Sequence, residues 1–132
     1  MKYYFSKTLK GVSFEDAITR VTDKLKEEGF GVLTDIDMQQ TLKKKLDVDI
    51  KKNRILGACN PPFAYKAMQA EDKIGLMLPC NVIVEEQARG TIEVSAIDPT
   101  ASMQAIDNIE LADVADEVRA KCRFECVDLL LN

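Results

Sequence analysis

The segment RILGACNPPF, residues 54–63, passes from one kind of secondary structure to another. Its apolar first half is typical of a buried strand, and we expect a strand over 53–59. Asn60 and Pro61 then favour a helix start. An asparagine side chain can cap a helix, and a proline at the first helical position has no N–H group to leave unpaired. The segment therefore predicts a strand that leads directly into a helix, with Cys59 at the junction.

The segment LPCNV, residues 78–82, contains a second cysteine–asparagine pair. Because proline cannot donate a hydrogen bond to a strand ladder, we expect extended segments over 74–78 and 81–86 with a bend at Pro79 between them. A turn and a strand over 91–97 then complete a hairpin. If the chain runs straight through the proline, side-chain alternation places five residues on one apolar face: Leu76, Leu78, Cys80, Val82 and Val84.

Hydrophobic spacing predicts the remaining elements. We expect strands over 2–9 and 30–36, helices over 14–28, 38–46, 61–71 and 109–131, and a helical turn over 101–106. Ser13 and Asp37 are suited to cap the first two helices. The element order β-α-β-(α)-β-α-β-β-α predicts one α+β domain over 1–132, with a mainly antiparallel sheet and helices on one face.

The chain has 132 residues, a net charge of -4 and no histidine. The missing histidine excludes Ser-His-Asp and Cys-His catalysis within one chain, and it excludes a mixed Cys/His zinc site. The acidic balance argues against nucleic acid as a partner, because nucleic-acid binding requires a clustered basic surface. Asp47 and Asp49 interrupt the lysine-rich stretch at 43–52, so we interpret that stretch as a solvated face.

No apolar run approaches the ~20 residues that a membrane span needs, so we expect no membrane as partner. The first residues lack the long apolar region of a signal peptide and look like a first strand, and we expect a cytoplasmic location. Thiols are kept reduced in that compartment, so we expect the four cysteines to be thiols and not a disulfide framework.

Cys59 and Cys80 are the first candidates for chemistry. Backbone N–H groups at a helix start favour a thiolate at Cys59, but a helix terminus contributes only ~0.3–1 kcal/mol, and a small buried residue is the alternative interpretation. Cys59 and Cys80 would form a regulatory thiol pair or a shared soft-metal site if neighbouring strands bring them together. Two thiols are two ligands short of a closed zinc site, and no phosphate-binding loop pattern is present, so we expect no metal and no cofactor.

Other candidate residues have simpler interpretations. Cys122 and Cys126 are four apart on a predicted helix, where cysteine packs as a small hydrophobic residue. Asp35 and Asp37 share one face of an extended strand, but general acid–base catalysis would need a pKa raised by burial. We interpret Asp37 as a helix cap and Asp98 as a residue that shapes the turn before a proline.

Three segments carry a family resemblance: 54–68 with its Cys-Asn-Pro sequence, 74–82 with its Leu-Pro-Cys sequence, and 94–99. Over nearly its whole length the chain resembles the widespread prokaryotic family called domain of unknown function 302. The resemblance implies a two-layer α/β sandwich with the topology of the TATA-binding-protein fold, which does not itself imply DNA binding. The family has no established activity, so no catalytic residue carries over. The resemblance places seven residues within the family signature: Cys59, Asn60, Pro61, Pro79, Cys80, Asp98 and Pro99.

The leading hypothesis is a small ligand-binding or sensing module. Its expected ligand-binding residues are Cys59, Asn60 and Cys80, with Asp98 nearby, and the start of the helix at 61 would contribute. The alternatives are a thiol-dependent enzyme or redox carrier, and a structural or subunit-interaction domain. An open sheet has edge strands to cover, so a homodimer is a further expectation.

Overall fold

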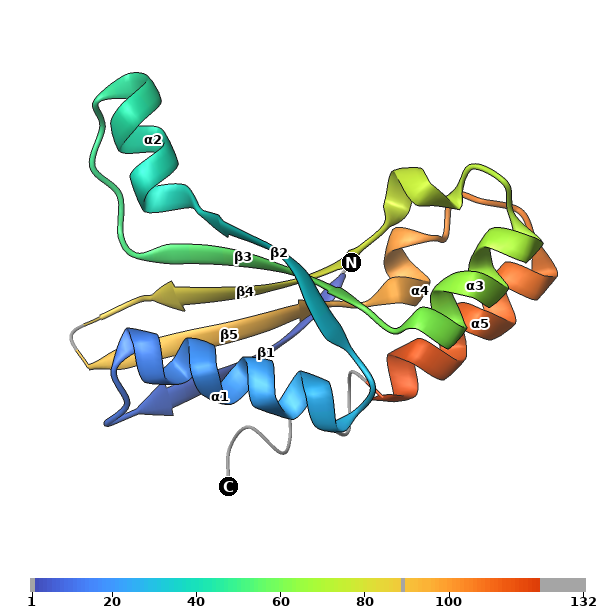
Figure 1. Ribbon diagram of the computed structural model, residues 1–132, viewed down its shortest axis with the longest axis horizontal. Coiled ribbons are helices and arrows are strands. Elements are labelled where there is room, and N and C mark those ends of the chain that lie inside the picture. The colour runs from blue at the N-terminus through green and yellow to red at the C-terminus, as the bar shows by residue number, and fades with distance from the viewer. Residues whose placement is uncertain (1, 89, 122–132) are drawn as a thin grey trace.

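The computed structural model describes residues 2–88 and 90–121. These residues form five strands and five α-helices, with one short 3-10 helix before the fourth strand (Figure 1). They are β1 (Tyr4–Lys10), α1 (Phe14–Glu27), β2 (Gly31–Asp37), α2 (Met38–Leu46), β3 (Asn53–Cys59), α3 (Pro61–Ala70), η1 (Ile74–Met77), β4 (Cys80–Glu86), β5 (Thr91–Ile97), α4 (Pro99–Ser102) and α5 (Ile109–Lys121).

The five strands form one antiparallel sheet in the order β1-β5-β4-β3-β2. The expected hairpin is present, because β4 pairs with β5. β1 and β2 are the edge strands of the sheet. The architecture is thus the two-layer α+β arrangement that the sequence predicts.

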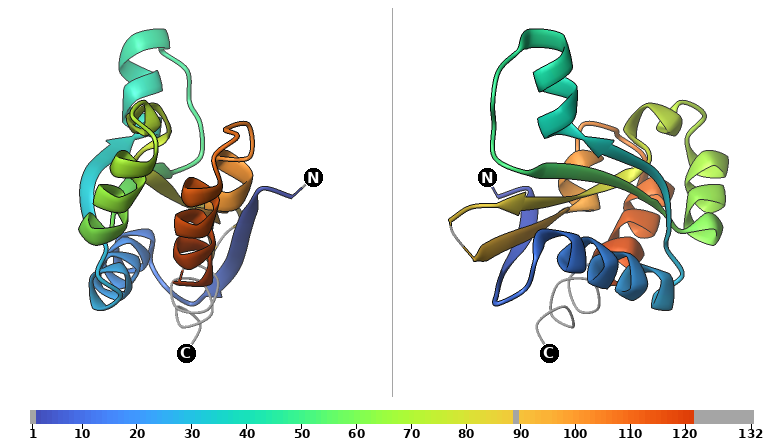
Figure 2. Two further views of the ribbon diagram at one scale, coloured as in Figure 1. Left: turned by 90° about the vertical axis from the view of Figure 1, so that its right-hand side faces the viewer. Right: turned by 60° about the vertical axis from the view of Figure 1, so that its left-hand side comes forward.

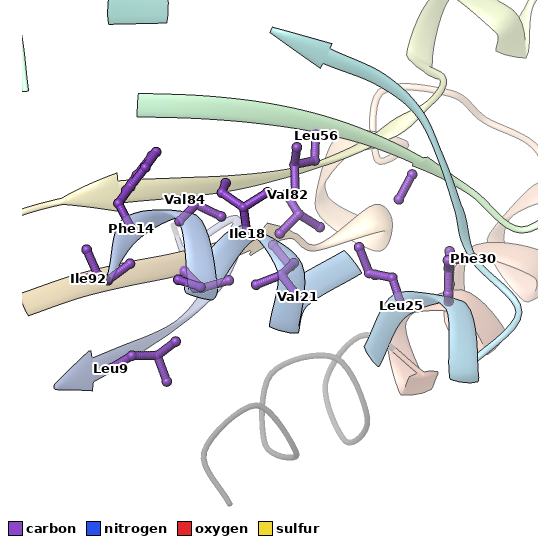
Figure 3. Close-up of a cluster of buried hydrophobic side chains, with 14 of the residues drawn as sticks. Leu9, Phe14, Ile18, Val21, Leu25, Phe30, Leu56, Val82, Val84 and Ile92 are labelled. Atoms are coloured by element: carbon purple, nitrogen blue, oxygen red, sulfur yellow. The ribbon is translucent and has the colours of Figure 1, made fainter. Parts of the chain in front are cut away.

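The main core lies between α1 and one face of the sheet (Figure 3). The four apolar residues of α1 that were expected at helical spacing, Phe14, Ile18, Val21 and Leu25, are all buried. They pack against alternate residues of the strands, such as Leu56, Val84 and Ile92. Burial of the four α1 side chains contributes roughly 6–12 kcal/mol as an upper estimate.

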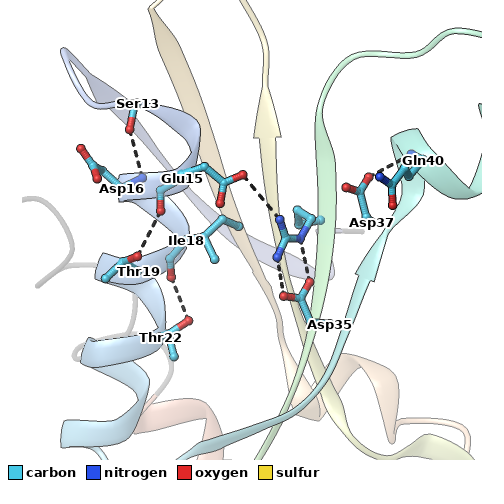
Figure 4. Close-up of polar contacts among 10 residues, drawn as sticks. Ser13, Glu15, Asp16, Ile18, Thr19, Thr22, Asp35, Asp37 and Gln40 are labelled. Atoms are coloured by element: carbon cyan, nitrogen blue, oxygen red, sulfur yellow. Dashed lines mark hydrogen bonds and ion pairs between the residues drawn. The ribbon is translucent and has the colours of Figure 1, made fainter.

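Capping side chains fix where the helices begin. The Asp16 N–H donates to the Ser13 hydroxyl at the start of α1, and the Gln40 N–H donates to the Asp37 carboxylate at the start of α2 (Figure 4). Gly29, with a φ of 84°, lets the chain turn out of α1 toward β2. Both predicted caps are confirmed.

The remaining helices lie at opposite ends of the sheet (Figure 2). α3, α4 and α5 gather at the end where β3 finishes and β4 begins, and they enclose a second apolar cluster. α2 lies at the other end, between β2 and β3, and none of its residues is buried. The first end therefore has its own packed core, whereas the apolar side of α2 is only partly covered.

The segment before Pro79 differs from the prediction. Residues Ile74–Met77 form a 3-10 helix and not an extended strand, and Leu76 is 85% exposed. The straight apolar face therefore begins at Cys80, and Leu76 and Leu78 do not belong to it. Burial of Ile74 explains the difference, because the turn directs this side chain into the second cluster with α3 and α5.

Two further boundaries differ. The helical turn after β5 lies at Pro99–Ser102, two residues earlier than expected, because the Asp98 side chain caps it. The last helix is observed over Ile109–Lys121, and the predicted continuation to residue 131, with Cys122 and Cys126, lies outside the described residues.

Within residues 2–88 and 90–121, every helix is too short or too polar to cross a membrane.

Candidate functional site

An apolar cavity of about 300 Å³ lies at the end of the sheet where β3 meets α3. The wall is formed by residues of β2, β3 and β4, of η1 and the loop before β4, and of α3, α4 and α5. The lining residues are Phe30, Leu33, Ala58, Cys59, Asn60, Phe63, Ala64, Ala67, Met68, Gly75, Leu78, Pro79, Cys80, Pro99, Met103, Val114, Ala115 and Val118. The chain thus brings four segments that are far apart in sequence to one hollow.

Cys59 and Cys80 both line this cavity, and both are partly buried. Cys59 is the last residue of β3 and Cys80 is the first of β4, where the ladder pairs Cys80 with Ala58. Successive side chains of a strand point to opposite faces, so this register directs Cys59 away from the face that carries Ala58 and Cys80. The register therefore favours two thiols on different parts of one wall over a directly bonded pair.

Asn60 lines the cavity, but both ends of its side-chain amide are used. Its Oδ1 accepts a hydrogen bond from the Phe63 N–H, and its Nδ2 donates to the Glu28 carbonyl oxygen. The predicted helix cap is confirmed, and the same side chain also ties α3 to the end of α1. Asn60 positions the cavity wall and has little capacity left for a ligand.

The start of α3 offers no spare backbone donor to the cavity. Pro61 and Pro62 have no N–H groups, the Phe63 N–H is taken by the Asn60 side chain, and the Ala64 N–H donates to the Asn60 carbonyl oxygen. Anion binding at a helix start depends on unpaired N–H groups. From the sequence, we expected this helix start to contribute to ligand capture. Its first residues offer no unpaired backbone N–H group for that role.

Close packing of Pro79 against β3 sets the position of the cavity wall. A Cβ atom on Gly57 would lie 2.7 Å from Cγ of Pro79 and would overlap the Thr34 hydroxyl group. Only glycine leaves room for both side chains over this point of the strand. The Leu78–Pro79 peptide bond is cis.

Asp98 is not among the described residues that line the cavity, although its neighbour Pro99 is. Its carboxylate accepts hydrogen bonds from the Thr100 N–H at 3.0 Å, from the Thr100 hydroxyl at 2.6 Å and from Nε of Arg119 at 3.1 Å. Burial alone would raise the pKa of Asp98, but the bonds from Thr100 and Arg119 outweigh it and lower the pKa. Asp98 therefore remains a carboxylate that caps α4 and holds α5 beside the cavity.

The other two candidate carboxylates have structural partners at a distance from the cavity. Asp37 caps α2, as expected. Asp35 accepts a hydrogen bond from Nε of Arg54 at 2.7 Å, and Arg54 also pairs with Glu15 of α1 (Figure 4). The hydrogen bond from Arg54 lowers the pKa of Asp35 despite partial burial. A lowered pKa is opposite to what a general acid requires near neutral pH.

The chemical character of the cavity follows from its wall. Among the described residues no charged side chain lines it, and no group of three metal-binding side chains occurs within 2–88 and 90–121. Two of its lining residues, Leu33 and Met68, are 68% and 57% exposed and therefore lie at its opening. This wall suits an apolar molecule.

Several lining residues were not identified as site residues from the sequence. Phe30 follows α1, and Val114, Ala115 and Val118 come from α5, far along the chain from the two cysteines. The apolar stripe of the last helix, with Val114 and Val118, was the available signal, but it predicts burial and not which cavity the helix faces.

Comparisons with known proteins agree with this fold. The family model described as "Domain of unknown function DUF302" matches residues 5–124. A solved structure described as an uncharacterised conserved DUF302 protein from Bacillus stearothermophilus is 26% identical, covers 97% of this chain and 98% of that chain, and has a TM-score of 0.86. No curated protein sequence matches the chain. The match over most of the sequence, together with the shared fold, shows that the chain belongs to the DUF302 family.

Proposed function

We propose that this protein is a small-molecule binding or sensing module whose site is the cavity beside α3. The observation that carries the proposal is that Cys59 and Cys80, from two neighbouring strands, line the same apolar cavity of about 300 Å³. Ligand sites are concave, mostly apolar and few per protein. Of the four residues expected to bind the ligand, Cys59 and Cys80 are proposed as contacts, whereas Asn60 and Asp98 are proposed to position the wall.

Binding is favoured over thiol catalysis because of what surrounds the thiols. A nucleophilic cysteine requires a nearby cation, a general base or unpaired N–H groups to stabilise its thiolate. The described lining residues include no lysine, arginine or carboxylate, and the N–H groups at the start of α3 are absent or already paired. The wall around Cys59 therefore supports a binding role over catalysis.

The proposal is tested by titrating ¹⁵N-labelled full-length protein with a mixed set of neutral, anionic and cationic fragments. We expect at least one fragment to shift the amide resonances of Ala58, Phe63 and Ala115, and we expect the shifts to disappear in Ala64→Leu, which fills the cavity from α3. In Gln69→Leu the same side chain is added to an exposed position of that helix, and binding should persist. A folded protein in which no fragment shifts these resonances would contradict the proposal.

We further propose that the module works in the cytoplasm without a nucleic-acid or membrane partner. The net charge of -4 supports this, because it disfavours approach to polyanions. The partly buried thiols Cys59 and Cys80 also fit a reducing compartment. Cell fractionation followed by immunodetection of the untagged chain tests the location.

We also propose that the chain pairs with a second copy through α2. Met38, Leu42 and Leu46 share one side of this helix at i, i+4 spacing, yet none of them is buried, and Leu46 is 66% exposed. An amphipathic helix normally buries its apolar side. Met38 and Leu42 are partly buried, and the exposed part of this side around Leu46 supports an intermolecular contact.

Charge complementarity supports a second copy as the partner of α2. The helix carries Lys43, Lys44 and Lys45 and no acidic residue. The sheet face opposite α1 has a shallow hollow whose lining includes Ile83, Ile97, Glu85 and Glu93. A basic helix with an apolar side complements such a face on a second copy. The second copy would place its own α2 on the first in the same way, so the interface would be isologous.

A further inference from the structure

We infer that the cavity selects a neutral, largely apolar molecule and rejects anions. This inference rests on the proposed binding function and specifies the class of ligand. In the sequence-based expectation, the start of the helix at 61 would contribute to ligand capture, and no class of ligand was specified.

The side-chain amide of the wall and the start of α3 beside it are already engaged in hydrogen bonds. The Asn60 amide donates to the Glu28 carbonyl and accepts from the Phe63 N–H, and Pro61 and Pro62 remove the donors that would otherwise face an anion. A ligand group that needs strong hydrogen bonds would lose its water without finding a replacement. Such unpaired burial costs roughly 1–3 kcal/mol for a neutral polar group and more for a charged one.

Three basic side chains of α3 and α5, the helices that border the cavity, make other contacts. Arg119 binds the Asp98 carboxylate, and the Lys66 and Lys121 ammonium groups lie over the Phe63 ring at 5.5 and 5.8 Å from its centroid. None of these three basic residues lines the cavity. An anion inside would therefore find no paired cation among residues 2–88 and 90–121 of the wall.

The volume limits the size of the ligand. An apolar cavity of about 150 Å³ holds one benzene molecule. The cavity beside α3, with about 300 Å³, therefore suits a molecule of roughly a dozen to fifteen non-hydrogen atoms, such as two fused or linked rings. The opening at Leu33 and Met68 allows a somewhat longer ligand to protrude, because methionine adapts its shape easily.

The test compares two dyes that differ by one charged group. N-phenyl-1-naphthylamine is neutral and slightly larger than the enclosed volume, so one of its rings would extend into the opening at Leu33 and Met68. 8-Anilinonaphthalene-1-sulfonate has the same ring system with a sulfonate added. Both fluoresce more strongly in apolar surroundings. We expect the neutral dye to bind at one molecule per chain and at least about tenfold more tightly than the sulfonate, because the sulfonate would be buried without a partner.

Variants show whether the dye occupies this cavity. Ala64→Leu should remove binding of the neutral dye, and Gln69→Leu on the exposed side of α3 should retain it. Equal or tighter binding of the sulfonate overturns the inference, and so does equal binding of the neutral dye to both variants. Absence of binding by either dye also overturns it. The proposed function fails separately, when no fragment of any charge shifts the amide resonances of the cavity wall.

Discussion

At the residue scale, the four side chains expected from the sequence to form the site differ in what surrounds them: three line the cavity, and Asp98 does not. Cys59 and Cys80 lie on the cavity wall. The polar atoms of Asn60 and Asp98 form hydrogen bonds that cap helices and join neighbouring elements. The caps were predictable because capping is a local property of sequence. The partners of Asp98 were not, since Arg119 comes from a helix that only tertiary packing brings near. Likewise, nothing local in the sequence indicates that Thr34 and Pro79 meet over Gly57.

Gly57→Ala tests the packing of Thr34 and Pro79 over β3. A Cβ atom there would overlap the Thr34 hydroxyl group and lie 2.7 Å from Cγ of Pro79, so the variant should lose about 1–3 kcal/mol of the free energy of unfolding in urea denaturation. The matched control is Gly31→Ala on the neighbouring strand, where a Cβ atom meets nothing within 4 Å and the change should stay within about 0.5 kcal/mol. Equal effects of both substitutions would contradict the close contact.

At the element scale, most of the secondary structure follows from capping residues and apolar spacing. The exception is informative: Ile74–Met77 looks extended in sequence but forms a 3-10 helix, because burial of Ile74 against α3 and α5 outweighs the local preference. The same packing of α5 creates the far wall of the cavity. The apolar spacing of the α5 sequence predicts that Val118 is buried, but it does not predict which part of the protein the helix packs against.

The link between α4 and α5 should depend on pH. Because the folded pKa of Asp98 is lowered, its carboxylate stabilises the fold above the unfolded pKa, which is near 3.8, and this stabilisation is lost as the pH falls through the folded value. Asp98→Asn should lower the free energy of unfolding by about 1–3 kcal/mol at pH 7, measured by urea denaturation.

The difference between Asp98→Asn and the wild type should shrink below about pH 4, because the wild-type carboxyl then becomes neutral as well. Asp113→Asn, at an exposed position of α5, is the control and should change stability little at either pH. A deficit for Asp98→Asn that stays constant down to pH 2 would show that its charge does not contribute.

At the scale of the whole molecule, the sheet has one face covered by α1 and an end that carries the cavity, whereas α2 has no fully buried residue (Figure 1). The sequence predicts the class of fold because the order of elements and the family signature both lead to it. It does not predict which helices enclose a cavity, because the positions of α3 and α5 depend on contacts between residues far apart in sequence.

Self-association is a prediction at this scale. Sedimentation velocity of the full chain should give about twice the 14.8 kDa mass of one copy, and Leu42→Lys should shift the protein toward one copy because it places a charge on the apolar side of α2. Gln40→Lys adds the same charge on the opposite side of the helix and should leave the mass unchanged. A wild type that sediments as one copy at every concentration would rule out the pairing.

The most direct measurement of the central claim is the labelling rate of Cys59 and Cys80 with iodoacetamide, with and without N-phenyl-1-naphthylamine. Trypsin separates the two cysteines into peptides 55–66 and 74–89, so mass spectrometry follows each thiol by itself. At a dye concentration ten times its Kd, both labelling rates should fall about tenfold, because only the unoccupied fraction reacts. In Ala64→Leu the dye should leave both rates unchanged. Bound dye that protects neither thiol in the wild type would contradict a ligand site in this cavity.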